Sequence, residues 1–330
     1  MASGYLVTGG AGFIGSHLVR ALLARGDAVT ALDDLSTGRW ANLAQVDGDG
    51  MFRFARGSVT DEHTVDELVR DADVVVHLAA AVGVRLIVDQ PLRSLLTNIR
   101  GTEIVLDAAD RHRRRVLIAS SSEIYGKNDA GALHEDSDRI GGSPAVSRWA
   151  YSTSKATGEV LAHAYHSERG LDVIITRFFN TVGPRQRAAY GMVIPTLVRQ
   201  ALAGEALTVY GTGRQTRCFC HVADTVDAVM RLLDTPSAGG GTFNVGGDEE
   251  VSIVDLARAV RHHAGGDPPI VLVPYDEAYG PGFEDMMRRV PDTTRLRRLT
   301  GWRPTRSLDE ILRETVAAVR AGRAAPRSTR

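Results

Sequence analysis

Residues 5–15 read Tyr-Leu-Val-Thr-Gly-Gly-Ala-Gly-Phe-Ile-Gly, a short apolar strand followed by a glycine-rich turn and the start of a helix. Gly9 suits a tight turn, Gly12 lets the backbone approach a bound group closely, and Gly15 lets the helix pack against the strand. The free N–H groups at a helix N-terminus stabilise phosphate charge. The segment therefore predicts a pyrophosphate site of the dinucleotide-binding type.

Strand-like and helix-like segments alternate through the first half of the chain. Continuous Val/Ile/Leu runs between helices are typical of strands buried on both faces of a parallel sheet. The pattern predicts a doubly wound α/β fold, the Rossmann arrangement. The expected strands are residues 5–7, 28–32, 74–78, 116–119 and 173–176, and the expected helices are residues 13–24, 65–70, 95–112 and 151–169.

From about Asn180 the alternation becomes irregular, with many Gly and Pro residues. We expect residues 1–179 to form the dinucleotide-binding domain. Residues 180–330 should form a smaller, loop-rich C-terminal α/β substrate domain that closes over the carboxyl edge of the sheet and is interleaved with late sheet elements. Residues 324–330 are expected to be a disordered polar tail.

The composition limits the classes of function. Hydrophobic residues make up 43% of the 330 residues, enough for a substantial core, and the formal net charge is −1. No overall basic field attracts nucleic acid or an anionic membrane. Neither a signal peptide nor a membrane-spanning apolar run is recognisable. Cys218 and Cys220 are too close in sequence for a disulfide and are expected to be core residues rather than metal ligands, which suits the cytoplasm.

The end of the second expected strand indicates which dinucleotide binds. Asp33 and Asp34 lie there, and Asp33 is 18 residues after Gly15. A carboxylate at this point accepts hydrogen bonds from the adenosine ribose diol and repels a 2′-phosphate, so NAD is favoured over NADP. Small residues at 78–80 should lie beside the cofactor, and residues 58–59 by the adenine. These residues are Leu78, Ala79, Ala80, Ser58 and Val59.

A tyrosine and a lysine lie four residues apart on one expected helix face, Tyr151 and Lys155. The pKa of a free tyrosine is about 10, and a neighbouring ammonium with the nicotinamide charge would stabilise its phenolate. Tyr151 is thus a candidate base for a sugar hydroxyl. Ser120, Ser121 and Ser122 end a strand upstream, at the sheet edge where ligands bind.

Together these segments resemble the extended short-chain dehydrogenase/reductase family, in its nucleotide-sugar branch. The resemblance covers nearly the whole chain and includes residues 9–15, 77–80, 119–126, 151–155, 177–186, 207–217 and 301–304. It implies NAD as cofactor, a nucleotide-linked sugar as substrate, no nucleic-acid or membrane partner, and a homodimer that packs helices 95–112 and 151–169 into a four-helix bundle.

The resemblance also implies roles for individual residues. The sugar donor should be UDP-linked. Ser121 and Tyr151 should contact its 4-hydroxyl group, and Lys155 should hold the nicotinamide ribose. Arg217 should neutralise the diphosphate, which suits a guanidinium. The remaining contacts expected for the cofactor are Phe13, Ile14, Asn98 and Phe178, and those for the substrate are Arg85, Asn180 (a phosphate), Arg185, Gln215, and Val193, Thr208 and Tyr210 around the nucleobase.

Three reactions remain open after oxidation at C4: decarboxylation, 4-epimerisation and 4,6-dehydration. A dehydratase favours a carboxylic acid beside the catalytic hydroxyl, where this chain has Ser122. The triplet at 121–123 is similar to that of UDP-glucuronate decarboxylases, and Arg289 matches an arginine near the sugar carboxylate. Glu123 would then position substrate or water near C5, and Arg289 would stabilise carboxylate or enolate charge.

Other segments favour the alternatives. Residues 147–150 differ from the stretch found in many decarboxylases, residues 81–85 and 190–195 are equally similar to epimerases, and a comparable triplet occurs in GDP-mannose 4,6-dehydratases. We rank decarboxylation first, epimerisation second and dehydration third. A non-catalytic NAD-binding sensor would tend to lack the tyrosine or the lysine, and this chain has both.

Overall fold

Seven parallel strands form the main sheet of the computed structural model, in the order β11-β6-β5-β4-β1-β2-β3. The structure describes residues 3–83, 90–188, 192–280 and 283–324. The strands are β1 (Gly4–Thr8), β2 (Ala28–Asp33), β3 (Phe52–Arg56), β4 (Val74–His77), β5 (Arg115–Ser121), β6 (Val173–Phe178) and β11 (Thr242–Val245). The order reverses direction between β1 and β4, and ligands bind in the crevice at such a switch point.

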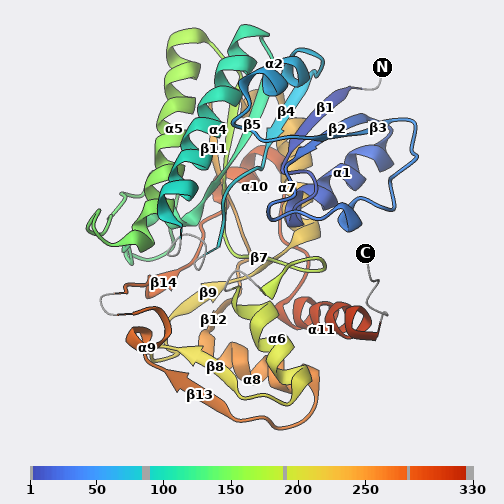
Figure 1. Cartoon of the computed structure of the whole chain (residues 1–330). Helices are drawn as coiled ribbons and strands as arrows, with labels where there is room; N and C mark the ends of the chain where they lie inside the picture. The colour runs from blue at the N-terminus through green and yellow to red at the C-terminus, as the bar shows by residue number, and fades with distance from the viewer. Residues whose placement is uncertain (1–2, 84–89, 189–191, 281–282, 325–330) are drawn as a thin grey trace.

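Helices cover both faces of this sheet, so the predicted doubly wound fold is confirmed (Figure 1). One face carries α2 (Glu62–Arg70), α4 (Pro91–Arg111) and α5 (Ala150–Arg169), whose apolar sides pack on residues such as Leu6 and Ile118. The other face carries α1 (Phe13–Arg25), α7 (Val222–Leu233) and α10 (Thr294–Thr300), which pack on residues such as Val7 and Ile174. The five strands expected from the sequence are present.

Two strands of the main sheet were not predicted. The first, β3, reads Phe-Arg-Phe-Ala-Arg. It was missed because this edge strand alternates apolar and polar residues and has no continuous apolar run. The second, β11, reads Thr-Phe-Asn-Val and lies in the irregular half of the chain. It pairs with β6 and therefore belongs to the main sheet. This pairing fits interleaved domains. The boundary at residue 180 stays a prediction.

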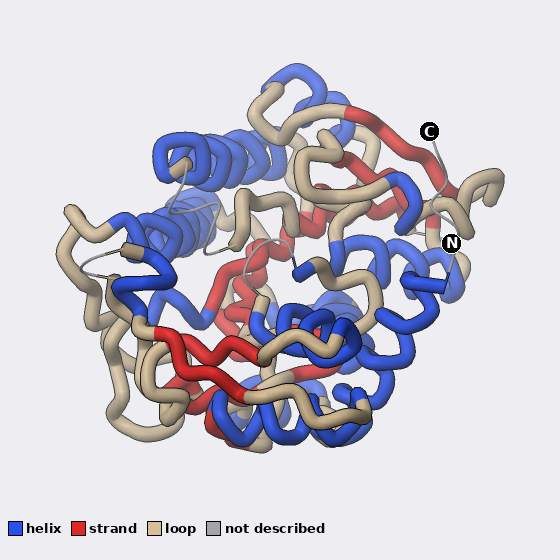
Figure 2. Tube along the Cα trace, turned by 60° about the horizontal axis from the view of Figure 1, so that its bottom comes forward, coloured by secondary structure: helices blue, strands red, loops and turns tan. Residues whose placement is uncertain are grey.

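The rest of the second half is built from helices and short strands as well as loops (Figure 2). Helices α6 (Val193–Ala203), α8 (Ile253–Ala264) and α11 (Leu308–Ala324) share a core that includes Leu197, Leu256 and Ile311. The parallel pair β8 (Leu207–Tyr210) and β13 (Ile270–Val273) lies against it. The small elements are β7 (Thr181–Val182), β9 (Thr216–Cys218), β10 (Cys220–His221), β12 (Glu250–Ser252), β14 (Arg288–Arg289) and α9 (Tyr275–Tyr279).

Short 3-10 helices complete the described elements: η1 (Trp40–Asn42), η2 (Ser122–Tyr125), η3 (Ser147–Trp149) and η5 (Pro236–Ala238). Within the described ranges, no helix is both long and apolar enough to cross a membrane. Cys218 and Cys220 are buried free thiols, and burial raises the pKa of each to about 12. No group of three or more metal-ligating side chains occurs among the described residues.

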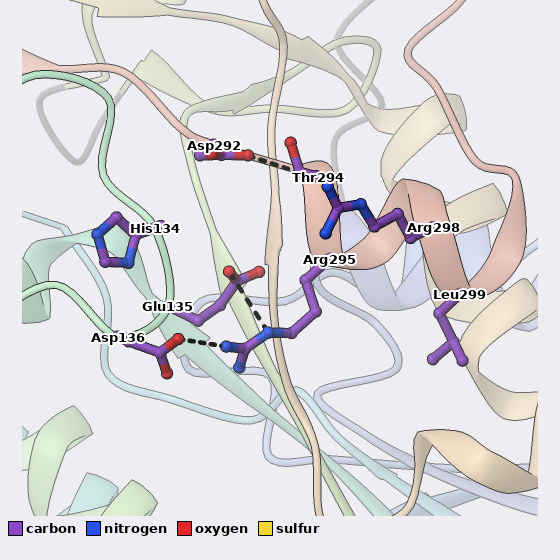
Figure 3. Close-up of a pocket in the computed structure, with 8 residues that line it drawn as sticks. All are labelled: His134, Glu135, Asp136, Asp292, Thr294, Arg295, Arg298 and Leu299. Atoms are coloured by element: carbon purple, nitrogen blue, oxygen red, sulfur yellow. Dashed lines mark hydrogen bonds and ion pairs between the residues drawn. The ribbon is translucent and has the colours of Figure 1, made fainter.

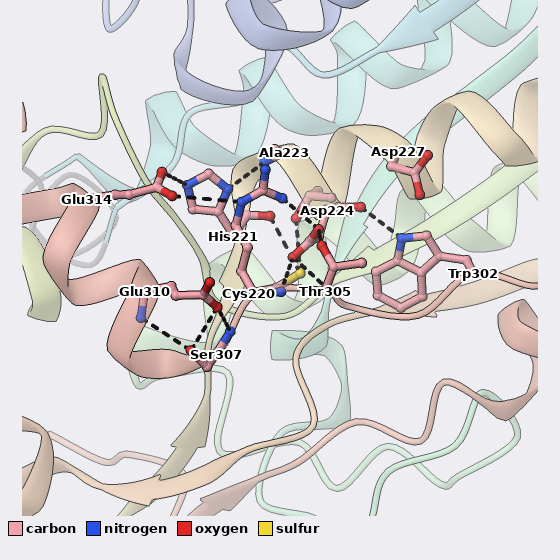
Figure 4. Close-up of polar contacts among 12 residues, drawn as sticks. Cys220, His221, Ala223, Asp224, Asp227, Trp302, Thr305, Ser307, Glu310 and Glu314 are labelled. Atoms are coloured by element: carbon pink, nitrogen blue, oxygen red, sulfur yellow. Dashed lines mark hydrogen bonds and ion pairs between the residues drawn. The ribbon is translucent and has the colours of Figure 1, made fainter.

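A polar cluster joins the segment before α11 to α7 (Figure 4). The buried Trp302 indole donates to the Asp224 carbonyl oxygen at 2.9 Å, and the Asp224 carboxylate accepts from Thr305 Oγ1 at 2.7 Å and Arg306 Nη1 at 2.9 Å. Trp302 belongs to the segment 301–304 that carried part of the resemblance. Its contacts are structural, because they connect the end of the chain to the helix layer of the main sheet.

Candidate active site

The glycine turn between β1 and α1 forms a cradle with no room for side chains. Gly9 has a φ of +69°, and a Cβ atom there would lie 2.8 Å from the Ala79 nitrogen. A Cβ atom on Gly15 would lie 2.2 Å from the Gly9 carbonyl oxygen. Gly12 is the N-cap of α1 and donates its N–H to that same oxygen at 3.0 Å. The first turn of α1 begins directly after Gly12, and the N–H groups of a first helical turn have no partner within the helix, which fits a pyrophosphate at this end of α1.

Asp33 ends β2 beside this turn. Its carboxylate accepts hydrogen bonds from the Ala11 nitrogen at 2.9 Å and the Leu35 nitrogen at 2.8 Å. Burial raises the pKa of Asp33, and the backbone hydrogen bonds oppose that rise. Asp34 is exposed and accepts from the Ser36 nitrogen instead. Of the two carboxylates, Asp33 is therefore the one fixed at the glycine turn, as a ribose ligand requires.

The other residues expected to contact the cofactor follow neighbouring strands of the sheet. Ala79 follows β4 and packs over Gly9, with Leu78 and Ala80 on either side. Phe178 ends β6, and Phe13 and Ile14 begin α1. Ser58 and Val59 follow β3, where Ser58 Oγ contacts Thr60 Oγ1 at 2.8 Å and Val59 is buried against α4. These positions fit NAD along the carboxyl edge of the strands.

Asn98 has a supporting position on α4. Its side-chain oxygen accepts from the Ala81 nitrogen at 2.8 Å, and its nitrogen donates to the Ala81 carbonyl oxygen and to Ser154 Oγ at 3.3 and 3.2 Å. Asn98 thus ties the segment after β4 to α5. Its expected contact with the cofactor stays a prediction.

Tyr151, Lys155 and Ser121 come together where α5 crosses the end of β5. Lys155 Nζ donates to the Ala119 carbonyl oxygen at 2.8 Å, and burial lowers the pKa of Lys155 to about 8. Burial and the Glu123 charge raise the pKa of Tyr151 well above its ordinary value, while its hydrogen bond with Ser121 and the cations of Arg289 and Arg148 oppose the rise. In the protein without ligands Tyr151 is therefore a neutral phenol, and it needs added positive charge nearby to act as a base.

Glu123 lies between two guanidinium groups beside Tyr151. One carboxylate oxygen accepts from Arg148 Nη1 and the other from Arg289 Nη1, both at 2.5 Å. Arg289 also donates to the Asn180 side-chain oxygen. Burial alone would raise the pKa of Glu123, but the two cations outweigh it and lower the pKa to about 2. Glu123 is therefore ionised at neutral pH and is a poor proton donor.

A second carboxylate continues this cluster away from Tyr151. Asp285 accepts from Arg217 Nη2 and from the Tyr275 hydroxyl, each at 3.1 Å, and lies 3.6 Å from Arg148 Nη2. Burial and the charge of Arg289 lower the pKa of Arg217 to about 10. Three arginines and two carboxylates thus form a continuous cluster with an excess positive charge, which suits an anionic substrate.

The expected nucleobase residues lie on α6 and β8, and Gln215, another expected substrate contact, follows in the turn after β8. Thr208 Oγ1 accepts from Gln200 Nε2 at 2.8 Å, and the buried Gln215 donates to the Tyr210 carbonyl oxygen at 2.8 Å. The Tyr210 ring contacts Tyr279 edge-on with centroids 5.3 Å apart, and Tyr279 stacks on Phe283 at 4.2 Å. Val193 begins α6 and packs on the core of this domain. An aromatic wall of this kind can pack against a base.

Two predicted residues, Arg185 and Ser122, have surroundings other than expected, and a third is outside the described residues. Arg185 has a φ of +73° and donates to Ser16 Oγ at 3.0 Å, so in this structure it contacts α1 rather than the arginine cluster. Ser122 is buried, with 2% of its surface exposed. Arg85 lies outside the described residues, as do residues 190 and 191 of the epimerase-like stretch.

A surface pocket of about 470 Å³ is separate from these residues (Figure 3). Its lining is His134, Glu135, Asp136, Asp292, Thr294, Arg295, Arg298 and Leu299. Arg295 crosses it and pairs with Asp136 at 2.5 Å and with Glu135 at 3.8 Å. No predicted site residue lines this pocket, so it is not the candidate active site.

Sequence reasoning missed Arg148, Asp285 and Tyr275. Arg148 was noted only as part of a segment that differs from many decarboxylases, although its position three residues before Tyr151 places it on the same side of the helix start. Asp285 and Tyr275 lie in the irregular half, and the arginines that Asp285 contacts, Arg217 and Arg148, are far from it in sequence. Only the folded chain brings them to Arg217.

The strand order, the glycine turn with Asp33, and the pair Tyr151 and Lys155 define a dinucleotide-dependent oxidoreductase of the extended short-chain dehydrogenase/reductase class. The profile of the NAD dependent epimerase/dehydratase family matches residues 5–246, and the chain belongs to this family.

Similar proteins carry several activities within this family. The chain is 38% identical to a UDP-N-acetyl-alpha-D-glucosaminuronate decarboxylase of Bacillus cytotoxicus, over 94% of this chain and 96% of the relative. It is 36% identical to UDP-glucuronic acid decarboxylase 1 of Xenopus tropicalis, over 94% and 70% of the two chains. The crystal structure of a Bacillus cereus UDP-glucuronic acid 4-epimerase with UDP-glucuronic acid and NAD has a TM-score of 0.87 and 30% identity, over 96% and 99%.

Proposed function

We propose that this protein is an NAD-dependent decarboxylase of a UDP-linked uronic acid, with UDP-glucuronate as the reference substrate and UDP-xylose or UDP-4-keto-xylose as the product. The observation that carries the proposal is the cluster of Glu123, Arg289 and Asn180 beside Tyr151. The similarity to curated decarboxylases over 94% of the chain supports it.

The first step is removal of the proton from the sugar 4-hydroxyl group. NAD, when bound, supplies a hydride acceptor for C4 and a positive charge near the phenol. Tyr151 acts in its phenolate form, which that positive charge, the Lys155 ammonium and the Ser121 hydroxyl stabilise, and it becomes a neutral phenol when it accepts the hydroxyl proton. Because the Lys155 pKa is about 8, the ammonium is mostly charged at neutral pH.

The second step is loss of carbon dioxide from C5. Oxidation at C4 makes the uronic acid a β-keto acid, so the C5–carboxylate bond breaks and its electrons form an enolate. Arg289, held by Glu123 and Asn180, provides the positive charge that orients the carboxylate and stabilises the enolate. A proton from water then binds C5 to give UDP-4-keto-xylose, and return to C4 of the hydride and proton removed in the first step gives UDP-xylose.

The alternative reactions require different proton donors and acceptors in the site. A 4,6-dehydratase needs a proton donor for the departing 6-hydroxyl, and an ionised Glu123 with a pKa of about 2 serves this role poorly. A 4-epimerase needs only Tyr151 and space for the keto sugar to turn over. The similarity to the Bacillus cereus epimerase makes 4-epimerisation of UDP-glucuronate the second candidate.

One experiment distinguishes these reactions. The purified protein is incubated separately with UDP-glucuronate and UDP-N-acetylglucosaminuronate, and the products are analysed by mass spectrometry and NMR. Loss of carbon dioxide from either substrate supports the proposal. An unchanged mass with inverted C4 makes the protein an epimerase, and NAD binding without turnover of any nucleotide sugar supports a sensor.

We also propose a cytoplasmic homodimer. Helices α4 and α5 lie side by side on one face of the molecule (Figure 1), and they expose Leu92, Leu96 and Val160. Pairing of these helices with those of a second copy would form a four-helix bundle and cover the apolar side chains.

A further inference from the structure

Arg148 is a buried cation three residues before Tyr151. It belongs to η3, which leads directly into α5, and only 4% of its side chain is exposed. Its Nη1 atom donates to Glu123 Oε2 at 2.5 Å, and its Nη2 atom lies 3.6 Å from Asp285 Oδ1. Arg148 thus contacts the carboxylate beside the reactive tyrosine and the carboxylate that binds Arg217.

The backbone around Arg148 is anchored from outside the site. The neighbouring Trp149 indole donates to Glu284 Oε2 at 2.7 Å, and a Cβ atom on Gly142 would overlap the Trp149 ring. The Arg148 guanidinium lies 5.7 Å from that ring. Because these contacts fix the residue before α5 begins, the direction of the Arg148 side chain is set independently of any substrate.

The contact with Arg148 leaves Arg289 with a single hydrogen bond to Glu123. A carboxylate facing only one guanidinium can form two parallel hydrogen bonds with it. Here Arg148 takes one Glu123 oxygen, so Arg289 keeps donor capacity, and its Nε atom has no hydrogen-bond partner among the described residues. Arg148 also supplies the excess charge of the cluster, since Arg217 and Arg289 alone would be balanced by Glu123 and Asp285.

We propose that Arg148 is a positioning residue for decarboxylation: it holds Glu123 away from a bidentate pair with Arg289 and thereby keeps Arg289 available to the substrate carboxylate. The inference rests on the proposed function. It assigns Arg148 no role in oxidation at C4, which depends on Tyr151, Lys155 and Ser121.

The two half-reactions test this assignment separately. In the Arg148→Met variant, release of carbon dioxide from UDP-glucuronate should fall on the order of 100-fold, because Arg289 is misplaced. Oxidation of UDP-xylose at C4, followed by absorbance of reduced NAD, needs no carboxylate and should change by less than about threefold. Equal loss of both reactions would overturn the proposal, since it would indicate a general structural role.

Two further variants keep the test decisive if Arg148→Met does not fold. Arg148→Lys keeps the charge but cannot direct two donors in a fixed plane, so it should lose about tenfold in carbon dioxide release and nothing in UDP-xylose oxidation. Arg288→Gln is the control, because Arg288 is on the same strand as Arg289 but pairs with Glu250 away from the site. Wild-type activity is expected for this control, and full activity of Arg148→Lys with UDP-glucuronate would refute the proposal.

A pH profile and a double variant give results that would not be expected if Arg148 had only a structural role. The groups facing Glu123 are Arg148 from η3, Arg289 from β14 and Tyr151 from α5, with Asp285 behind Arg148. Loss of one cation should shift the acidic limb of carbon dioxide release to higher pH. Addition of Arg148→Met to Glu123→Gln should cause no further loss, and an additive loss would contradict action through Glu123. If the wild type releases no carbon dioxide, the proposed function itself fails.

Discussion

Replacement of Gly15 by alanine tests the cofactor cradle with a single methyl group. The added Cβ atom would lie 2.2 Å from the Gly9 carbonyl oxygen and 2.9 Å from Gly9 C and Gly10 Cα. Ordinary contacts between such atoms are about 3.5 Å, so the start of α1 must move by roughly 1 Å from the turn. The perturbation therefore reaches the N–H groups at the start of α1 that are predicted to bind the pyrophosphate.

The expected size of the effect follows from overpacking, which costs about 1–3 kcal/mol. With an unfolding entropy of about 0.7 kcal/mol/K for a chain of this length, the melting temperature should fall by about 1–4 °C. If a similar free energy is lost from binding, the Kd for NAD rises by about 5- to 160-fold. Thermal unfolding and titration of NAD by protein fluorescence measure the two quantities.

Gly50→Ala provides the matched control, because a Cβ atom there has no other atom within 4 Å and the residue is exposed. Its melting temperature and NAD affinity should equal those of the wild type. If Gly15→Ala binds NAD within about twofold of the wild type, the turn is not the pyrophosphate site and the assignment of the cradle is wrong.

Three other predictions concern the reactive pair and the assembly. Tyr151→Phe should reduce C4 oxidation by a factor of about 10³ while NAD affinity is unchanged, measured by steady-state kinetics and titration, and near-normal turnover would exclude Tyr151 as the base. Activity should fall as pH rises through about 8, where Lys155 loses its charge. In the unfolded chain this lysine keeps its proton to about pH 10.5, so the free energy of unfolding should increase between pH 8 and 10.5. Denaturant titrations at each pH separate this gain in stability from the loss of activity. Leu96→Asp should convert the proposed dimer to a monomer in light scattering, and a monomeric wild type would contradict the dimer.

Local pattern was sufficient to predict most of the main sheet and the cofactor turn. The apolar strands around Val7 and Ile174 and the glycines at 9, 12 and 15 each depend on neighbours in sequence, so their roles are visible there. The strand β3 was missed because its edge position removes the continuous apolar run. The strand β11 was missed because its place in the sheet depends on a chain return that no local signal marks.

The electrostatic surroundings of the arginine cluster could not be predicted from the sequence pattern. Arg217 and Arg289 were identified through resemblance, but their electrostatic surroundings depend on Glu123, Arg148 and Asp285 from separate parts of the chain. The protonation state of Glu123 follows from two cations that approach it from different elements. Such a state is a property of the folded arrangement, so the sequence left the role of Glu123 open.

Because β11 pairs with the outer side of β6, the main sheet includes a strand from the second half of the chain. A fragment that stopped near residue 180 would lack this strand and also α7 and α10, and it would leave the apolar surface around Ile174 and Leu18 in water. The backbone groups of β6 would become an unpaired edge, a template for aggregation. Cofactor and sugar recognition therefore cannot be separated by cutting the polypeptide once, and any recombination of these modules between relatives must exchange several discontinuous pieces together.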